Sequence, residues 1–240
     1  MAEILLTHSN HVFFDRKQTE KMQPYPPLQT ILAAAVLRKA GIDVALFDPS
    51  LEPPESGFEE ALERHNPKML VVCEDDFNFL SKMCLTRNRE LAFWMANRAR
   101  QQGIVSAVHG SDASDHVAEY IAAGFKAVLV GEVERTLLEL AQGREFSRID
   151  GLAYYEANGG GAGRVRYNRP RRLESNLDSL PLPAWDLVDI ERYRSAWLSR
   201  HSYFSLNIVS SRGCPFHCNW CAKPIYVNTY HARSARAVAS

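Results

Sequence analysis

The chain has 240 residues, of which 46% are hydrophobic, and this is enough apolar material for one folded domain and the start of a second. Lysine plus arginine and aspartate plus glutamate number 28 each, so the net charge of zero argues against partners held mainly by charge, such as nucleic acid or an anionic membrane. The sequence contains no apolar run long enough to predict a membrane span, and the spacing of three of the 5 cysteines is not that of disulfides. We therefore expect a cytoplasmic protein that acts on a small-molecule substrate.

Short apolar segments alternate with helical patterns along the first part of the chain. Five such segments, rich in valine, isoleucine and leucine, predict strands buried on both faces: residues 3–8, 43–48, 69–74, 105–110 and 127–132. Amphipathic helices that stop at a glycine are predicted over 28–41, 89–103, 114–124 (with Ser114 as the cap) and 134–143. The alternation predicts a five-stranded, parallel, doubly wound α/β domain of the Rossmann-like type, which we assign to residues 1–148.

The pattern changes after this domain. Residues 151–168 predict two strands around a glycine-rich turn, and a proline-punctuated connector follows, so we assign 149–200 to a β-hairpin and linker. Residues 203–211 predict a new strand that leads into three clustered cysteines, and we assign 201–240 to the start of another domain. The five arginines within 164–172 could contact phosphate, but a solvated hairpin face or a clasp onto the second domain is favoured.

The clustered cysteines Cys214, Cys218 and Cys221 have the spacing CxxxCxxC. Three thiolates on one loop can bind three irons of a [4Fe–4S] cluster and leave the fourth iron open as a reaction site. The alternative is a structural zinc with His217 or His231 as the fourth ligand. Zinc loops usually pair CxxC with a second, distant pair, which this sequence lacks, so the cluster is favoured.

This segment resembles the signature of the radical S-adenosylmethionine enzymes. Besides the cysteine spacing, that signature has an aromatic residue before the third cysteine, here Trp220, and the Arg-Gly before Cys214 and the proline after it also match. The resemblance implies that the three cysteines bind a [4Fe–4S] cluster, which cleaves S-adenosylmethionine to a 5′-deoxyadenosyl radical. It also implies a partial TIM barrel, an external electron donor of the flavodoxin or ferredoxin type, and Trp220 near the adenine. Simple packing beneath the loop is the other interpretation of Trp220.

The first domain is similar to the cobalamin-binding module of the cobalamin-dependent branch of that family. Residues 25–44 match the first helix of the module, 109–114 match its glycine-rich loop, and 130–140 match its Gly-Glu-x-Glu segment. The polar segments THSNH, CEDDFN, HGSDAS and GEVER follow strand ends, which is the edge where open α/β sheets bind ligands. The resemblance implies that cobalamin binds at this edge.

Several residues of these segments are candidate cobalamin contacts. Gly110, Ser111 and Gly131 are small enough for the backbone to approach a broad planar ring. Ser111, Ser114 and Glu132 can form hydrogen bonds with the amides at its periphery. Ordinary turn or cap chemistry explains the two glycines equally well, and it is the better explanation for Asp112 and Ser114.

The first loop lacks the DxHxxG motif by which many cobalamin domains supply a histidine to cobalt. His8 and His11 could approach the crevice, but histidines at strand ends are more often surface or capping residues. We therefore expect cobalamin without a histidine axial ligand. Cys73 is predicted to be a core residue at the end of a buried strand, and Cys84 is placed at a helix start.

We therefore predict a fragment of a cobalamin-dependent radical S-adenosylmethionine enzyme that methylates or rearranges an unactivated carbon. Because a radical domain needs roughly 200 residues, the 240 residues alone are expected to be inactive. The alternatives are a non-catalytic cobalamin-binding module with a vestigial cluster loop, or a radical enzyme whose first domain no longer binds cobalamin. The methylthiotransferase branch is disfavoured because it needs three further cysteines and only Cys73 and Cys84 are present.

Overall fold

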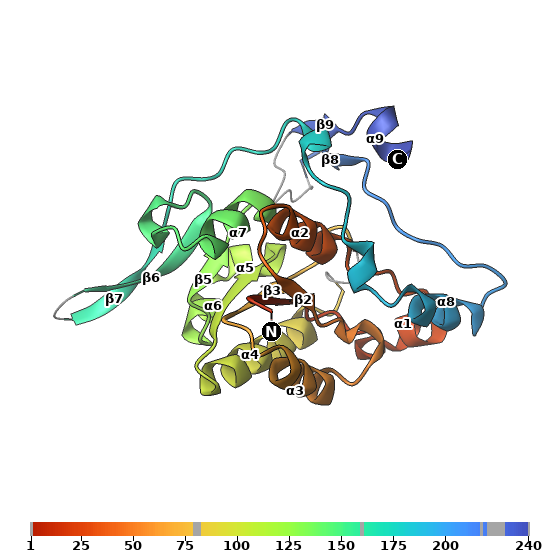
Figure 1. The fold of residues 1–240 in the computed structure, drawn as a ribbon, viewed down its shortest axis with the longest axis horizontal. Helices are drawn as coiled ribbons and strands as arrows, with labels where there is room; N and C mark the ends of the chain where they lie inside the picture. The colour runs from red at the N-terminus through yellow and green to blue at the C-terminus, as the bar shows by residue number, and fades with distance from the viewer. Residues whose placement is uncertain (1, 79–82, 159–160, 217, 220–228, 240) are drawn as a thin grey trace.

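The computed structural model describes residues 2–78, 83–158, 161–216, 218–219 and 229–239. Its centre is a seven-stranded sheet with the strand order β2-β1-β3-β4-β5-β6-β7 (Figure 1). The first five strands in this order are mutually parallel, and they are β1 Ile4–Thr7, β2 Val44–Leu46, β3 Met69–Cys73, β4 Val105–His109 and β5 Ala127–Leu129. The prediction of an α/β domain with five parallel strands is therefore confirmed.

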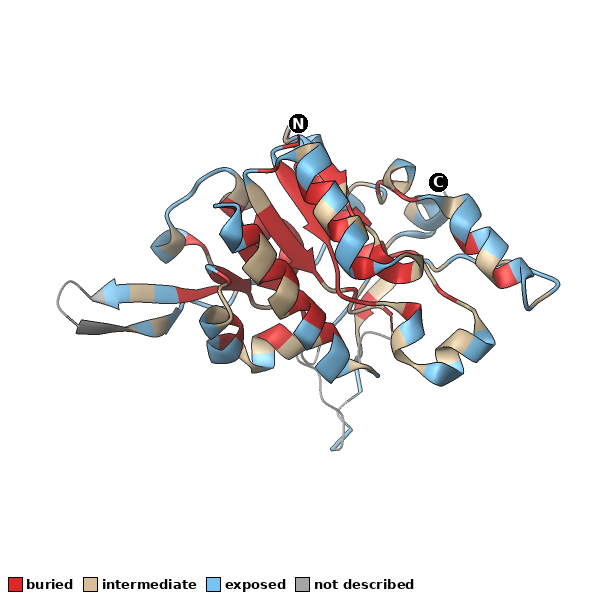
Figure 2. Cartoon of the chain, turned by 90° about the horizontal axis from the view of Figure 1, so that it is seen from below, coloured by how far each residue is buried: buried red, intermediate tan, exposed pale blue. Residues whose placement is uncertain are grey.

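Helices cover both faces of this sheet, and Figure 2 shows the strands buried between them. On one face Leu5 and Leu70 pack with residues of α3 Pro54–His65, α4 Leu85–Gln101 and α6 Val117–Ala122. Their neighbours Leu6 and Val71 point to the other face and pack with α2 Leu28–Lys39 and α7 Val133–Ala141. Because successive side chains of a strand point to opposite faces, two apolar faces require the continuous apolar runs seen in the sequence.

Three of the four predicted helices are present as α2, α4 and α7, each ending within two residues of the glycine that was expected to stop it. The prediction for 114–124 is wrong at its start. The segment forms α5 Ser111–Asp115 and then α6, because the backbone of His116 leaves the helical region at φ −122°. Ser114 lies inside α5, where its hydroxyl donates to the Gly110 carbonyl at 2.8 Å instead of capping a helix. The amphipathic helix α3 was not predicted, although proline at its first position is a start signal.

The predicted hairpin consists of β6 Leu152–Asn158 and β7 Gly161–Tyr167, and it extends the same sheet because β6 pairs antiparallel with β5. The arginines of 164–172 pair mostly with acids of this domain. Arg166 contacts Glu156 at 3.1 Å on the exposed hairpin face, and Arg171 pairs with Glu139 of α7. The basic stretch therefore forms a solvated hairpin face and ties the connector to its own domain.

The connector after β7 packs against the domain. It contains the 3-10 turns η5 Leu177–Ser179 and η6 Trp185–Leu187, followed by α8 Ile190–Leu198. Tyr193 and Trp197 of α8 are each only 1% exposed, and the Trp197 indole N–H donates to the Pro24 carbonyl at 2.7 Å. The remaining short elements are η1 Val12–Phe14, α1 Arg16–Lys21, η2 Pro49–Leu51 and η4 Phe146–Arg148.

The predicted strand over 203–211 is wrong. Residues 203–210 form no strand, and only β8 Ser211–Gly213 pairs, antiparallel, with β9 Tyr230–Ala232 ahead of α9 Ala235–Ala239. A strand exists through hydrogen bonds to a neighbour, and no strand within the described part of the chain lies beside 203–210. None of the helices in that part is both long and apolar enough to cross a lipid bilayer.

Candidate functional site

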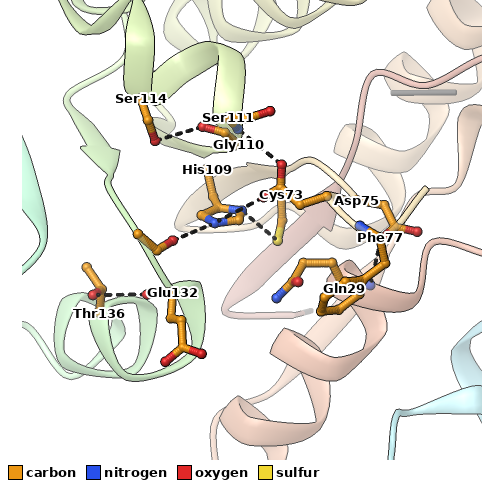
Figure 3. Close-up of polar contacts among 12 residues, drawn as sticks. Gln29, Cys73, Asp75, Phe77, His109, Gly110, Ser111, Ser114, Glu132 and Thr136 are labelled. Atoms are coloured by element: carbon orange, nitrogen blue, oxygen red, sulfur yellow. Dashed lines mark hydrogen bonds and ion pairs between the residues drawn. The ribbon is translucent and has the colours of Figure 1, made fainter. Parts of the chain in front are cut away.

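The parallel strands bring their carboxyl ends to one edge of the sheet, where the polar segments predicted from the sequence meet. The chain order reverses between β1 and β3, which is the point where open α/β sheets bind ligands. Figure 3 shows Asp75 after β3, Ser111 after β4 and Glu132 after β5 around this edge. The structure therefore places Ser111 and Glu132, two of the predicted contacts, at the same edge of the sheet, with glycines Gly110 and Gly131 in the same loops.

The two glycines of this edge have different surroundings. Gly110 has φ +151°, and a Cβ placed on it would lie 2.9 Å from the Cβ of Glu74, so packing against Glu74 explains this glycine. Gly131 has φ +85°, and no heavy atom lies within 4 Å of the position of a Cβ. Ser111 follows Gly110, is partly exposed, and donates its backbone N–H to Asp76 at 3.2 Å. There is therefore free space at the Cβ position of Gly131 and not at that of Gly110.

Three consecutive acids follow β3, and sequence reasoning assigned none of them a role. Asp75 accepts hydrogen bonds from the backbone N–H groups of Leu28 and Gln29 at 3.1 and 3.3 Å and so caps α2, while burial raises its pKa to about 6. Glu74 accepts from the Ser9 hydroxyl at 2.6 Å, and burial raises its pKa to about 7. The feature of the sequence that could have identified these acids as site residues is their position, as a run of three directly after a fully apolar strand.

Two oxygens of this acidic run have no hydrogen-bond partner within the described residues. They are Oε2 of Glu74 and Oδ2 of Asp76, and both are buried. Because a buried acceptor without a partner is costly, the amide N–H donors at the periphery of a corrin ring are suitable partners for these atoms. Oδ2 of Asp76 lies 3.6 Å from Nε2 of His109, within ion-pair range, so Oε2 of Glu74 is the oxygen of this run with neither kind of partner among the described residues.

The histidines near the edge are engaged in the fold. His8 is 1% exposed, its Nδ1 accepts from the Asn10 N–H at 3.1 Å, and its Nε2 contacts Asp48 at 3.1 Å. Burial alone would lower the pKa of His8, but the hydrogen bond and charge of Asp48 outweigh it and raise that pKa. His11 bonds the Pro49 carbonyl at 2.7 Å, and His109 bonds the Gly131 carbonyl at 2.9 Å.

Arg212, two residues before the first clustered cysteine, is buried against the loop after β5. One of its terminal nitrogens donates to Glu132 at 2.9 Å and to Glu134 at 3.3 Å, and the other bonds the second oxygen of Glu134. Gln29 donates to Glu134 at 3.1 Å, and Glu132 accepts from the Glu174 backbone N–H at 2.6 Å. We call Arg212, Glu132, Glu134 and Gln29 the Arg212 clasp.

The two carboxylates of the Arg212 clasp respond differently to burial. Burial favours the neutral form of Glu134, but the charge and hydrogen bonds of Arg212 outweigh it and lower the pKa of Glu134. At Glu132 burial dominates over Arg212 and raises the pKa. Glu134 is therefore the principal anionic partner of Arg212, because it offers both oxygens to the guanidinium group.

The cysteine loop follows the clasp directly. Cys214 is partly buried and Cys218 is exposed, and neither is in a disulfide. Trp220 and Cys221 lie outside the described residues. Within those residues no group of three His, Cys, Asp or Glu side chains is placed to hold a metal ion.

The two other cysteines have the positions that the sequence predicts. Cys73 is fully buried at the end of β3, and burial raises the pKa of its thiol well above the usual value. Cys84 directly precedes the first residue of α4. Cys73 is therefore a core residue whose thiolate is disfavoured, and Cys84 stands at a helix start.

Comparison with known proteins identifies partial relatives. No protein-family model matches the chain. An uncharacterized methyltransferase of Pyrococcus horikoshii is 37% identical over 103 residues, which cover 41% of this chain and 20% of that protein. An anaerobic magnesium-protoporphyrin IX monomethyl ester cyclase of Synechocystis sp. is 24% identical over 213 residues, which cover 82% of this chain and 38% of that protein. Both relatives are enzymes by name, and the chain spans less than half the length of each.

Proposed function

We propose that the chain belongs to a radical S-adenosylmethionine enzyme in which Cys214, Cys218 and Cys221 hold a [4Fe–4S] cluster. The observation that carries this proposal is the CxxxCxxC spacing, combined with the contact of Arg212, two residues before the first cysteine, to Glu132 after β5. When bound, the cluster supplies the electron that cleaves S-adenosylmethionine. An external flavodoxin or ferredoxin would deliver that electron, and Trp220 would lie against the adenine.

We further propose that the sheet domain binds cobalamin at its carboxyl edge, beside Gly131. The space around the Cβ position of Gly131 and the Glu74 oxygen without a hydrogen-bond partner support this assignment. Ser111 adds a partly exposed hydroxyl group, whereas Glu132 contributes by holding the loop through Arg212. Both ring nitrogens of His8 have partners in the fold, which supports binding without a histidine ligand to cobalt.

The relatives favour methyl transfer or rearrangement of an organic small molecule. One is named a methyltransferase, and the other is named a cyclase of a monomethyl ester that works anaerobically. Anaerobic conditions suit an exposed iron–sulfur cluster, and the four described cysteines that are free of disulfides suit a reducing cytoplasm. The role of the chain's own residues is to bind both cofactors, to orient them toward one substrate and to exclude water.

Anaerobic reconstitution with iron and sulfide tests the cluster assignment. We expect about four irons per chain and a broad charge-transfer absorption, because the three cysteines supply the thiolates of a [4Fe–4S] cluster. Cys214→Ala should lower the iron content severalfold, whereas Cys84→Ala, which removes a cysteine at the start of α4, should not. Equal iron content in the two variants would contradict the assignment, and zinc bound to the chain as purified, without iron uptake, would support the structural alternative.

Titration with hydroxocobalamin tests the second assignment separately. We expect saturable binding with an absorption spectrum that lacks histidine coordination. Gly131→Leu should weaken binding because it fills the open space, and Gly143→Leu is a matched control, since Gly143 also has positive φ and open space around its Cβ position. If no binding occurs, the cobalamin assignment fails and the sheet domain becomes a substrate or partner module of a radical enzyme.

A further inference from the structure

We infer that Arg212 is a positioning residue that fixes the cysteine loop at the β5 end of the sheet through the Arg212 clasp. This inference rests on the proposed function, because it takes the loop to be a cluster site. Arg212 lies in β8 two residues before Cys214, and its partners Glu132 and Glu134 follow β5, 80 and 78 residues earlier in the chain. The clasp is therefore a long-range contact placed directly beside the loop.

Arg212 is the most deeply buried residue in the described part of the chain around the loop. Among the described residues of 198–239, Arg212 is the only one that is buried, at 4% exposure. Of the apolar residues that precede it, Ile208 and Leu206 are exposed at 72% and 41%, whereas Phe204 and Val209 are partly buried against the core. On the far side of the loop Ser234 donates its backbone N–H to Asp178 at 2.9 Å, at an exposed position. Arg212 supplies the buried, charged contacts nearest to Cys214.

The geometry of the clasp restricts the position of Arg212 closely. Its guanidinium group donates to three carboxylate oxygens, and its central carbon lies 5.6 Å from the centre of the Phe77 ring. Gln29 of α2 holds Glu134 from the other side. A planar group with several fixed donors permits one orientation, whereas a lysine ammonium would act as a single point charge.

The clasp also restrains the far side of the loop. Within the β8–β9 ladder Arg212 pairs with His231, so the chain that returns after the cysteines is hydrogen-bonded to the strand that Arg212 anchors. Glu132 itself directly follows Gly131, beside which we place the corrin ring. One buried ion pair thus joins the two proposed cofactor sites, and it holds the residue two positions before Cys214 at the edge of the sheet.

The inference is tested first on the metal-free chain, by the alkylation rate of each cysteine with iodoacetamide, read by mass spectrometry. Arg212→Met leaves two buried carboxylates without their cation, so the loop should detach and Cys214 should react about tenfold faster or more. Cys84 serves as the internal reference, and protection of the buried Cys73 shows that the sheet remains folded. Arg38→Met is the matched control, because it removes an exposed ion pair with Asp186 that involves no residue of the Arg212 clasp and should change no rate.

If Arg212→Met exposes Cys73 as well, the milder Arg212→Lys variant decides, because it keeps the charge and loses only the fork geometry. After reconstitution we expect Arg212→Lys to retain the iron content of the unmodified chain but to broaden the electron paramagnetic resonance signal of the reduced cluster. Unchanged Cys214 rates in Arg212→Met with Cys73 still protected, or an unchanged signal in Arg212→Lys, would overturn the inference. Failure of the unmodified chain to take up iron would refute the proposed function instead. The alkylation rates are measured on the metal-free chain, so they test the role of Arg212 independently of iron uptake.

Discussion

Tyr193 donates a hydrogen bond of 2.6 Å to Asp48, and this contact joins helix α8 to the end of β2 across 145 residues of sequence. The same carboxylate contacts His8 at 3.1 Å and accepts from the Ser50 backbone N–H at 3.0 Å, and the side-chain partners His8 and Tyr193 are each 1% exposed. Burial alone would raise the pKa of Asp48, but the bonds to His8 and Tyr193 lower it to about 2. One carboxylate thus links the first loop, the second strand and the connector.

Tyr193→Phe tests this link. The substitution keeps the ring and removes the hydroxyl donor, so the buried Asp48 carboxylate loses a partner and the free energy of unfolding should fall by about 1–3 kcal/mol. Tyr203→Phe is the control, because the Tyr203 hydroxyl is exposed and accepts one bond from Gln23. Urea denaturation of the two variants at pH 7 measures the difference. A loss no larger for Tyr193→Phe than for Tyr203→Phe would contradict the linking role of Asp48.

Trp197 is the apolar counterpart of this link. Its indole packs edge-on against Tyr25 with ring centres 5.3 Å apart and contacts Tyr203 and Phe204 in the same way. Trp197→Ala should cost about 3–5 kcal/mol, since it removes a fully buried ring and the bond to Pro24. Chymotrypsin should then cleave the exposed Tyr203 faster, whereas cleavage elsewhere in the sheet domain should not change. Uniform acceleration at all sites would point to global unfolding and not to release of α8.

Because the pKa of Glu74 is raised in the folded chain, Glu74 makes the free energy of unfolding fall as the pH rises. In the folded chain its pKa is raised to about 7 by burial, while in the unfolded chain it ionises near 4.5. The contribution of Glu74 to the free energy of unfolding is thus fully present below pH 4.5. It is lost as the pH rises through 7, because Glu74 of the unfolded chain releases its proton at a lower pH than Glu74 of the folded chain. Glu74→Gln keeps an acceptor for Ser9 and cannot ionise.

The variant Glu74→Gln should therefore be more stable than the unmodified chain at pH 8, by about 1–3 kcal/mol, and equal to it at pH 4. Denaturation curves at the two pH values measure this change. Glu63→Gln, at an exposed position of α3, provides the comparison and should show the same stability as the unmodified chain at both pH values. A stabilisation by Glu74→Gln that is independent of pH would show that ionisation is not the cause.

Local patterns predicted the sheet domain well because its signals are local. A strand buried on both faces needs a continuous apolar run, as in Met69–Cys73, and a helix such as α2 ends where a glycine follows it. The strand prediction for 203–211 failed because an apolar alternation does not reveal whether a neighbouring strand exists to pair with it. The split between α5 and α6 depends on the backbone of the single residue His116.

The contacts that define the candidate site could not be predicted from such patterns. Arg212 and Glu134 both lie in segments that the sequence singles out, yet nothing in either segment indicates that they meet across 78 residues. Likewise the role of Asp48 depends on His8 and Tyr193, which lie 40 and 145 residues away. Charged side chains are usually exposed, so their burial follows from the tertiary arrangement alone.

Gly213, directly before Cys214, has φ +79°, and a Cβ placed on it would lie 2.0 Å from the Thr229 carbonyl oxygen. Gly213→Ala should therefore push β9 away from β8 and lower iron uptake severalfold on reconstitution. Gly143→Ala is the control for the cost of a positive φ alone, because Gly143 has φ +73° with open space around its Cβ position. This variant should lose about 1–2 kcal/mol of stability without any change in iron uptake. Equal iron uptake by the two variants would mean that the β8–β9 pairing does not shape the cysteine loop, since the steric conflict at Thr229 is what distinguishes them.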